Sequence, residues 1–77
     1  MTSSLHRTNY WLRRAIADEL LATPGLDSSH MRVAVKEGVV LLSGEAASQR
    51  QVLCAVGVAG QIPGVMGVGS TMTLIPA

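Results

Sequence analysis

The stretch MRVAVKEGVVLLSGEA, residues 31–46, decides the fold of this chain. Larger apolar side chains alternate with smaller or charged ones over residues 31–36, a period of two that is typical of a half-buried strand. Glu37-Gly38 follows, and glycine supplies the positive φ that a tight reversal of the chain requires. Residues 39–43 form a second β-branched and aliphatic run, which Gly44 closes. The sequence therefore predicts a hairpin of two antiparallel strands.

Length and composition limit what the rest of the chain can be. Seventy-seven residues make one small domain, and 48% of them are hydrophobic while 3% are aromatic, so the core must be aliphatic. The net charge of +1 argues against a nucleic-acid binder held by phosphate contacts, so we expect no nucleic-acid partner. Cys54 is the single cysteine, which excludes an internal disulfide framework.

A helix is predicted before the hairpin and another after it. The first begins at Thr8 or Asn9, either of which can cap it, and ends at Thr23-Pro24-Gly25. Residues 1–8 are therefore expected to be a flexible N-terminus, and residues 9–75 a single domain. The second helix opens with Ala47 and Ser48 and runs to about Gln61. The core-facing side chains recur at helical spacing: Leu12, Ile16 and Leu20 in the first helix, and Val52, Ala55, Ala59 and Ile62 on the second.

A third strand is predicted over residues 68–75, after the stop signal Ile62-Pro63-Gly64. The fold class is then α+β, an αββαβ two-layer sandwich in which both helices cover one face of a three-stranded mixed sheet. Because the second helix is a crossover, the third strand should run parallel to the second. The sequence leaves open whether the third strand lies beside the first or the second.

The same residues carry a resemblance to a bacterial family. The run V-x-V-K-E-G-V-V-x-L-S-G at 33–44, then Arg50, Ala55, Val58-Ala59 and I-P-G-V-x-G-V at 62–68, resembles the BON domain over about residues 9–75. The resemblance implies an αββαβ fold with a mixed sheet. It also implies a module without enzymatic activity or cofactor that binds phospholipid or makes contacts at the bacterial envelope, in the periplasm. The family is named for osmotic-stress and nodulation members.

The charge distribution points to a second surface. Every Asp, Glu, Lys and Arg lies at or before Arg50, yet the longest later apolar run, residues 52–60, is far short of the ~20 residues that span a bilayer. Two explanations of this uncharged helix stay open: a tolerated apolar surface, or a side covered by a second copy or another domain. The candidate self-association or docking residues are Leu53, Cys54, Gly57 and Gly60 of the second helix, with Leu41 of the hairpin.

The first helix offers the competing surface. Aromatic rings beside arginines suit a bilayer interface, because the rings sit at headgroup depth and guanidinium groups pair with anionic phosphate. The candidate lipid-contact residues are Arg7, Tyr10, Trp11, Arg14 and Leu21. The alternative is an ordinary amphipathic helix whose Trp11 folds over the edge of the sheet.

Other candidate sites lack support in the sequence. His6 and His30 have no ligand-spaced companion, so we expect no metal, and Cys54 has no partner that would make a nucleophile. Gly64 and Gly67 spell G-x-x-G, but without basic neighbours they shape a turn rather than clamp nucleic acid. We assign no catalytic residue, and we assign Gly38, Gly44 and Gly64 to structural turns.

Two classes of function follow. The first is a non-enzymatic binding module that contacts anionic phospholipid or another envelope protein. The alternative is a protein–protein assembly module, through homo-oligomerisation or interdomain docking, that uses the outer side of the second helix and the outer sheet residues Val39, Leu41 and Ile75. The sequence as given has no apolar signal core at its N-terminus, so the cytoplasm is expected if it is a complete protein.

Overall fold

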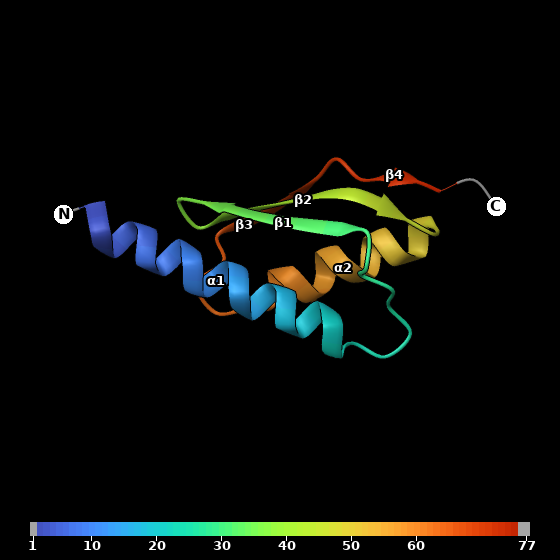
Figure 1. Ribbon diagram of the computed structural model, residues 1–77, viewed down its shortest axis with the longest axis horizontal. Helices are drawn as coiled ribbons and strands as arrows, with labels where there is room; N and C mark the ends of the chain where they lie inside the picture. The colour runs from blue at the N-terminus through green and yellow to red at the C-terminus, as the bar shows by residue number, and fades with distance from the viewer. Residues whose placement is uncertain (1, 76–77) are drawn as a thin grey trace.

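Two helices lie on one face of a mixed sheet in the computed structural model, which describes the backbone of residues 2–75 and the side chains of residues 9–75 (Figure 1). The elements are α1 (Thr2–Ala22), β1 (Met31–Lys36), β2 (Val39–Ala46), α2 (Gln49–Gly60), β3 (Gly67–Ser70) and β4 (Thr73–Leu74). This arrangement confirms the predicted α+β class and the placement of both helices on one side.

The hairpin forms where the sequence predicts it. Lys36 and Val39 pair across a two-residue turn in which Glu37 and Gly38 have φ of 53° and 81°. Positive φ at both central positions gives the reversal whose twist matches that of the flanking strands. Strands β1 and β2 are antiparallel, and the whole of β1 pairs with residues 39–44 of β2, with Val33 opposite Leu42. The tight turn therefore fixes which side chains of the hairpin share a face.

The third strand lies beside β2 and runs parallel to it, so the order is β1-β2-β3 and β1 is an edge. The prediction of one unbroken strand over residues 68–75 is wrong, because pairing stops after Ser70 and resumes at Thr73. The Ser70 hydroxyl accepts a hydrogen bond from the Met72 backbone N–H at 3.3 Å, which bends the chain locally. The offset between partners is the same in both segments, so β4 continues the register of β3 after a gap.

Strand β2 does not end at Gly44, contrary to the sequence-based prediction, but continues to Ala46. Gly44 lies inside the strand with φ of 101°, and a Cβ built on it would lie 2.1 Å from the His30 carbonyl oxygen. The same carbonyl accepts a hydrogen bond from the Glu45 N–H at 2.9 Å. Gly44 therefore lets β2 continue past a close backbone contact that no other residue type would permit. Gly38 and Gly64 also have positive φ, at the turns assigned to them.

Helix α1 begins at Thr2, so the predicted start at Thr8 or Asn9 is wrong. Neither proline nor glycine occurs in residues 2–8, and nothing in that segment interrupts helical hydrogen bonding. The predicted end holds, since α1 stops at Ala22 immediately before Thr23-Pro24-Gly25. The domain limits 9–75 stay a prediction.

The core lies between the sheet and the two helices and is wholly aliphatic. Its buried members are Leu12, Ile16, Leu20, Val40, Leu42, Ala46, Val52, Ala55 and Ala59. Both predicted helical stripes are among them, except Ile62, which is half-buried and packs against the cluster. Val33 and Val35 also pack against it from β1. Burial of a large aliphatic side chain contributes about 1.5–3 kcal/mol, so these contacts supply most of the stability of so small a domain.

Polar contacts fix the N-terminal end of α2. The Ser48 hydroxyl accepts from the Gln51 backbone N–H at 3.3 Å and so caps the helix, as predicted. The Gln51 amide then holds the loop between α1 and β1: its nitrogen donates to the Gly25 carbonyl at 2.8 Å, and its oxygen accepts from the Asp27 N–H at 2.9 Å. This bracing positions the start of β1 against α2.

Candidate functional site

One turn of α1 places two aromatic rings and two arginines on the surface. The Tyr10 and Trp11 side chains are 49% and 62% exposed, and their rings meet edge to face, with centroids 5.9 Å apart and planes at 77°. The Arg13 guanidinium lies 5.9 Å from the centroid of the Tyr10 ring. Edge-to-face packing and the cation above the ring hold these side chains together without burying them. We call Tyr10, Trp11, Arg14 and Leu21 the α1 flank.

The remaining members of the α1 flank are also exposed. Leu21 is 74% exposed, and the Arg14 Nε lies 3.9 Å from an Asp18 carboxylate oxygen, an ion pair open to solvent on both sides. Such a pair contributes less than about 1 kcal/mol and leaves the guanidinium free to exchange partners. The structure thus places four predicted lipid-contact residues on one helix surface. The fifth, Arg7, lies outside the residues whose side chains are described.

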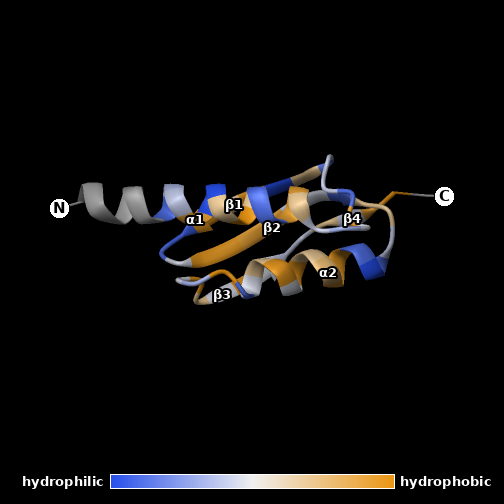
Figure 2. Ribbon diagram, turned by 90° about the horizontal axis from the view of Figure 1, so that it is seen from below, coloured by the Kyte–Doolittle hydropathy of each residue, from blue (hydrophilic) through white to orange (hydrophobic). Residues whose placement is uncertain are grey.

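The outer side of α2 is apolar beyond its first turn, and Figure 2 shows hydrophilic colour confined to the N-terminal end of this helix. Leu53 is 63% exposed, Gly57 and Gly60 are exposed, and Cys54 is half-buried. Leu41, which the sequence analysis grouped with them, lies on the helix-free face of the sheet, because its neighbours Val40 and Leu42 point into the core. The five residues therefore do not share one surface. Val39 and Ile75, on the sheet, are also exposed.

A groove follows the seam between α1 and the edge strand β1. Its central hollow, of about 530 Å³, is lined from both elements by Tyr10, Arg13, Arg14, Ala17, Asp18, Met31, Arg32 and Val33. A hollow of about 280 Å³ continues it past Val35, and one of about 270 Å³ continues it past Leu21. Arg32 belongs to the outer face of β1 while Val33 packs on the core, so the groove opens at the edge of the sheet. We call it the β1 edge groove.

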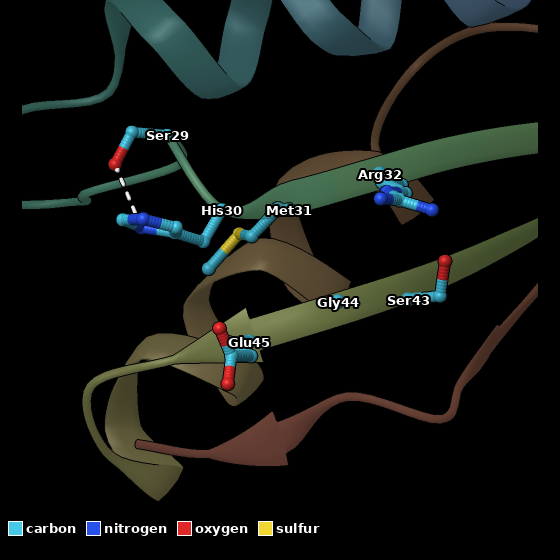
Figure 3. Close-up of a pocket in the computed structure, with 7 residues that line it drawn as sticks. All are labelled: Ser29, His30, Met31, Arg32, Ser43, Gly44 and Glu45. Carbon is cyan, nitrogen blue, oxygen red and sulfur yellow. Dashed lines mark hydrogen bonds between the residues drawn. The ribbon is translucent and has the colours of Figure 1, made fainter.

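A further hollow, of about 490 Å³, lies at the other end of the hairpin around His30 and Gly44 (Figure 3). The Ser29 hydroxyl donates to an Asp27 carboxylate oxygen at 2.6 Å and lies 3.2 Å from His30 Nδ1. This hydrogen bond and one from the Ser29 N–H lower the pKa of the Asp27 carboxyl from its ordinary value. Because the serine proton goes to the carboxylate rather than to the imidazole, His30 does not activate Ser29 as a nucleophile.

The other side chains of this hollow do not converge. Figure 3 shows Arg32 and Glu45 at separate places along the hairpin, pointing away from each other. Among the residues whose side chains are described, no three His, Cys, Asp or Glu gather as metal ligands would. His6 lies outside those residues. Within residues 2–75, no helix combines the length and the apolar character needed to cross a bilayer.

A family model for the BON domain matches residues 8–76, nearly the whole chain. The chain belongs to the BON domain family. This confirms the resemblance drawn from the hairpin and from the I-P-G-V-x-G-V run. Comparison with curated protein sequences finds no match.

Among solved structures, this BON domain is similar to CdsD, described as a structural protein of the type III secretion system of Chlamydia trachomatis. The TM-score is 0.74 at 20% identity, over 90% of this chain and 32% of that one, so the likeness concerns the fold. The chain spans about a third of the length of that protein. Family and fold together support a non-catalytic binding or assembly module.

Sequence reasoning missed the β1 edge groove. The groove exists because β3 pairs with β2 and leaves β1 at the edge, and the sequence left that order open. Arg32 and Lys36 alternate with the core-facing residues of β1, and charged side chains on a strand are one way in which edges are protected from unwanted pairing. That alternation was the available signal. Arg13 also borders the groove, and the sequence analysis assigned it to no site.

Proposed function

We propose that this BON domain contacts an anionic membrane surface through the α1 flank. The observation that carries the proposal is the exposure of Tyr10 and Trp11. They are the single tyrosine and the single tryptophan of a chain without phenylalanine, and neither is used in the core. In a domain this small, large aromatic side chains normally supply core area. Their placement side by side in water, next to two arginines, favours a partner that accepts both a ring and a cation.

The bilayer interface is such a partner. Indole and phenol rings are stabilised at the level of the headgroups, and a guanidinium group pairs with phosphate in two-pronged geometry. A helix lying flat on the interface would insert Trp11 and Leu21 and hold Arg14 among the headgroups. The loose Arg14–Asp18 pair could exchange its carboxylate for a lipid phosphate at little cost. The bacterial envelope, in which BON domains are found, offers anionic lipid and is the location we propose.

Replacing Trp11 by alanine is expected to weaken binding to vesicles at least tenfold. Removal of roughly 100 Å² of insertable indole surface, at about 25 cal/mol per Å², forfeits about 2 kcal/mol or more. Co-sedimentation with phosphatidylglycerol-containing vesicles measures the effect. In the unsubstituted protein, the single tryptophan should also show a blue-shifted emission when vesicles are added.

Two controls separate insertion from general stickiness. Leu53→Ala removes an equally exposed apolar side chain from α2 and should leave vesicle binding unchanged. Arg14→Ala should weaken binding to anionic vesicles and leave the weak binding to pure phosphatidylcholine as it was. Full retention of binding by the Trp11→Ala variant would exclude the α1 flank as the contact.

The outer side of α2 favours assembly as a second candidate function. Leu53 is mostly exposed beside Gly57, one turn on, and a Cβ added at Gly57 would meet no atom within 4 Å. Interior packing therefore does not require that glycine, which costs a helix about 1 kcal/mol relative to alanine, whereas close approach by another surface would. CdsD is described as a structural protein of a secretion system, a role that a docking surface of this kind would serve.

Self-association is the version of this candidate that is simplest to measure. Sedimentation velocity at rising protein concentration should show a dimer or larger species, and Leu53→Glu should return the protein to a monomer by placing a charge in the contact. Leu41→Glu, on the opposite face, should not. A protein that stays monomeric at millimolar concentration would remove self-association as a function of α2.

A further inference from the structure

We propose that the β1 edge groove binds an extended acidic segment of a partner protein, which adds to the sheet as a strand antiparallel to β1. This inference goes beyond membrane contact and does not depend on it. The argument rests on three features of the groove: free backbone groups on β1, an apolar floor between β1 and α1, and an excess of positive charge on the rim.

On its open edge, β1 presents backbone N–H and C=O groups that can pair with an added strand. In an antiparallel pair, opposite residues alternate between those that exchange backbone hydrogen bonds and those that do not. Lys36 and Val39 flank the two-residue turn and form a bonded pair, and the His30 carbonyl accepting from the Glu45 N–H keeps the same phase. Val33 and Val35 therefore direct their N–H and C=O groups away from β2, toward the open edge.

The apolar floor of the groove can accommodate every second side chain of an added strand. Val33 and Val35 pack toward the core from β1, and the wall of α1 contributes Tyr10 and Ala17. The two end hollows, of about 280 and 270 Å³, both reach Val33 from opposite directions. Because side chains of one strand face the same way at every second residue, two aliphatic side chains spaced by two would enter these hollows.

The charge of the rim selects the partner. Arg32 and Lys36 lie on the outer face of β1, with Ala34 between them, and Arg13 lies on the wall of α1. Asp18 is the acidic residue that lines the central hollow, and it is already paired with Arg14. An added strand would place one side chain opposite Arg32 and another opposite Lys36, four residues apart. The five residues of the added strand that lie opposite β1 should therefore follow the pattern acidic, aliphatic, any residue, aliphatic, acidic.

A second copy of this chain fits the same edge poorly. Antiparallel pairing of two β1 strands about Ala34 would set Arg32 of each copy directly opposite Lys36 of the other. Like charges facing each other across two strands are destabilising. In this register the edge therefore disfavours self-pairing, while it favours an acidic strand.

The test uses the whole chain and a capped peptide, Gly-Asp-Val-Thr-Val-Glu-Gly, titrated by heteronuclear NMR. The amide resonances of Val33 and Val35 should shift most. N-methylation of the two peptide valines, whose N–H groups face β1, should abolish binding. N-methylation of the threonine, whose N–H faces away, should leave it within about twofold. Equal loss from both modifications, or no binding at millimolar peptide, would overturn the proposal.

Charge exchange supplies the matched protein variants. The double variant Arg32→Glu with Lys36→Glu should weaken the acidic peptide at least tenfold and gain affinity for a peptide with lysine at both acidic positions. Arg50→Glu, on α2, should change neither titration. Trp11→Ala should also leave the peptide titration unchanged, because Trp11 lines a different hollow from the groove, so failure of membrane binding and failure of strand addition are told apart. A dimer that protects the Val33 and Val35 amides without peptide would overturn the proposal in favour of self-pairing.

Discussion

Replacing Gly44 by alanine is expected to destabilise the domain by about 3–5 kcal/mol, the largest effect of any single methyl added to this chain. The new Cβ would lie 2.1 Å from the His30 carbonyl oxygen, which is backbone and already hydrogen-bonded, so one of the two strands must move. The positive φ at this position adds the ordinary cost of a left-handed conformation, about 1–2 kcal/mol. Urea unfolding followed by far-ultraviolet circular dichroism measures the change.

Gly25 provides the matched control for this substitution. Its φ of 79° is also positive, but a Cβ built on it meets no atom within 4 Å. Gly25→Ala should therefore cost about 1–2 kcal/mol, the conformational part alone. Similar losses in the two variants would show that the His30 carbonyl is not the obstacle that the structure indicates. The free energy of unfolding of a 77-residue domain is roughly 4–12 kcal/mol in all, so Gly44→Ala should remove about a quarter of it or more.

Leu42→Ala is expected to cost about 2–5 kcal/mol, because Leu42 is fully buried in the central strand between the sheet and both helices. The truncated side chain leaves a cavity that rigid neighbours on β1 and the helices cannot fill. Thermal unfolding should show the midpoint lowered by at least about 8 °C, given about 4–8 °C per kcal/mol for domains of this size.

The same substitution at the neighbouring Leu41 tests whether the core lies on only one face of the sheet. Leu41 points to the helix-free face and is 43% exposed, so Leu41→Ala should cost less than about 1 kcal/mol. The contrast between two adjacent leucines on one strand measures the asymmetry of the sandwich directly. Comparable losses at both positions would mean that the outer face of the sheet is covered in solution.

The parts of the fold that the sequence predicts correctly are those encoded by near neighbours. The turn at Glu37-Gly38 fixes the hairpin register, and the spacing of Leu12, Ile16 and Leu20 fixes the buried side of α1. The strand order is not local. It depends on which edge of the hairpin the crossover helix brings the third strand to, and this in turn creates the β1 edge groove.

Other departures from prediction have equally specific causes. The break between β3 and β4 arises from a hydrogen bond between the Ser70 hydroxyl and the Met72 N–H, which competes with the ladder and has no periodic signature. The continuation of β2 through Gly44 looks like a stop signal in sequence, because glycine serves both as a terminator and as a means of close approach. At the candidate sites, the exposure of Trp11 and Leu53 agrees with their helical phase, and that of Leu41 agrees with its place among the predicted outer sheet residues. Leu41 and the outer side of α2 lie on opposite faces of the molecule, so this group of docking candidates is divided between two surfaces.

The gap between β3 and β4 has a mechanical consequence. Tension applied to the chain beyond Ile75 would first peel away β4, which is held by a two-residue pairing and the hydrogen bond from the Ile75 N–H to the Ala46 carbonyl. The residues before β4 are held separately, because the Thr71 N–H donates to the Leu42 carbonyl at 2.9 Å and Met72 packs against the core. Residues 73–75 can thus leave β2 and pair with it again in the same register, while the packed sandwich stays intact.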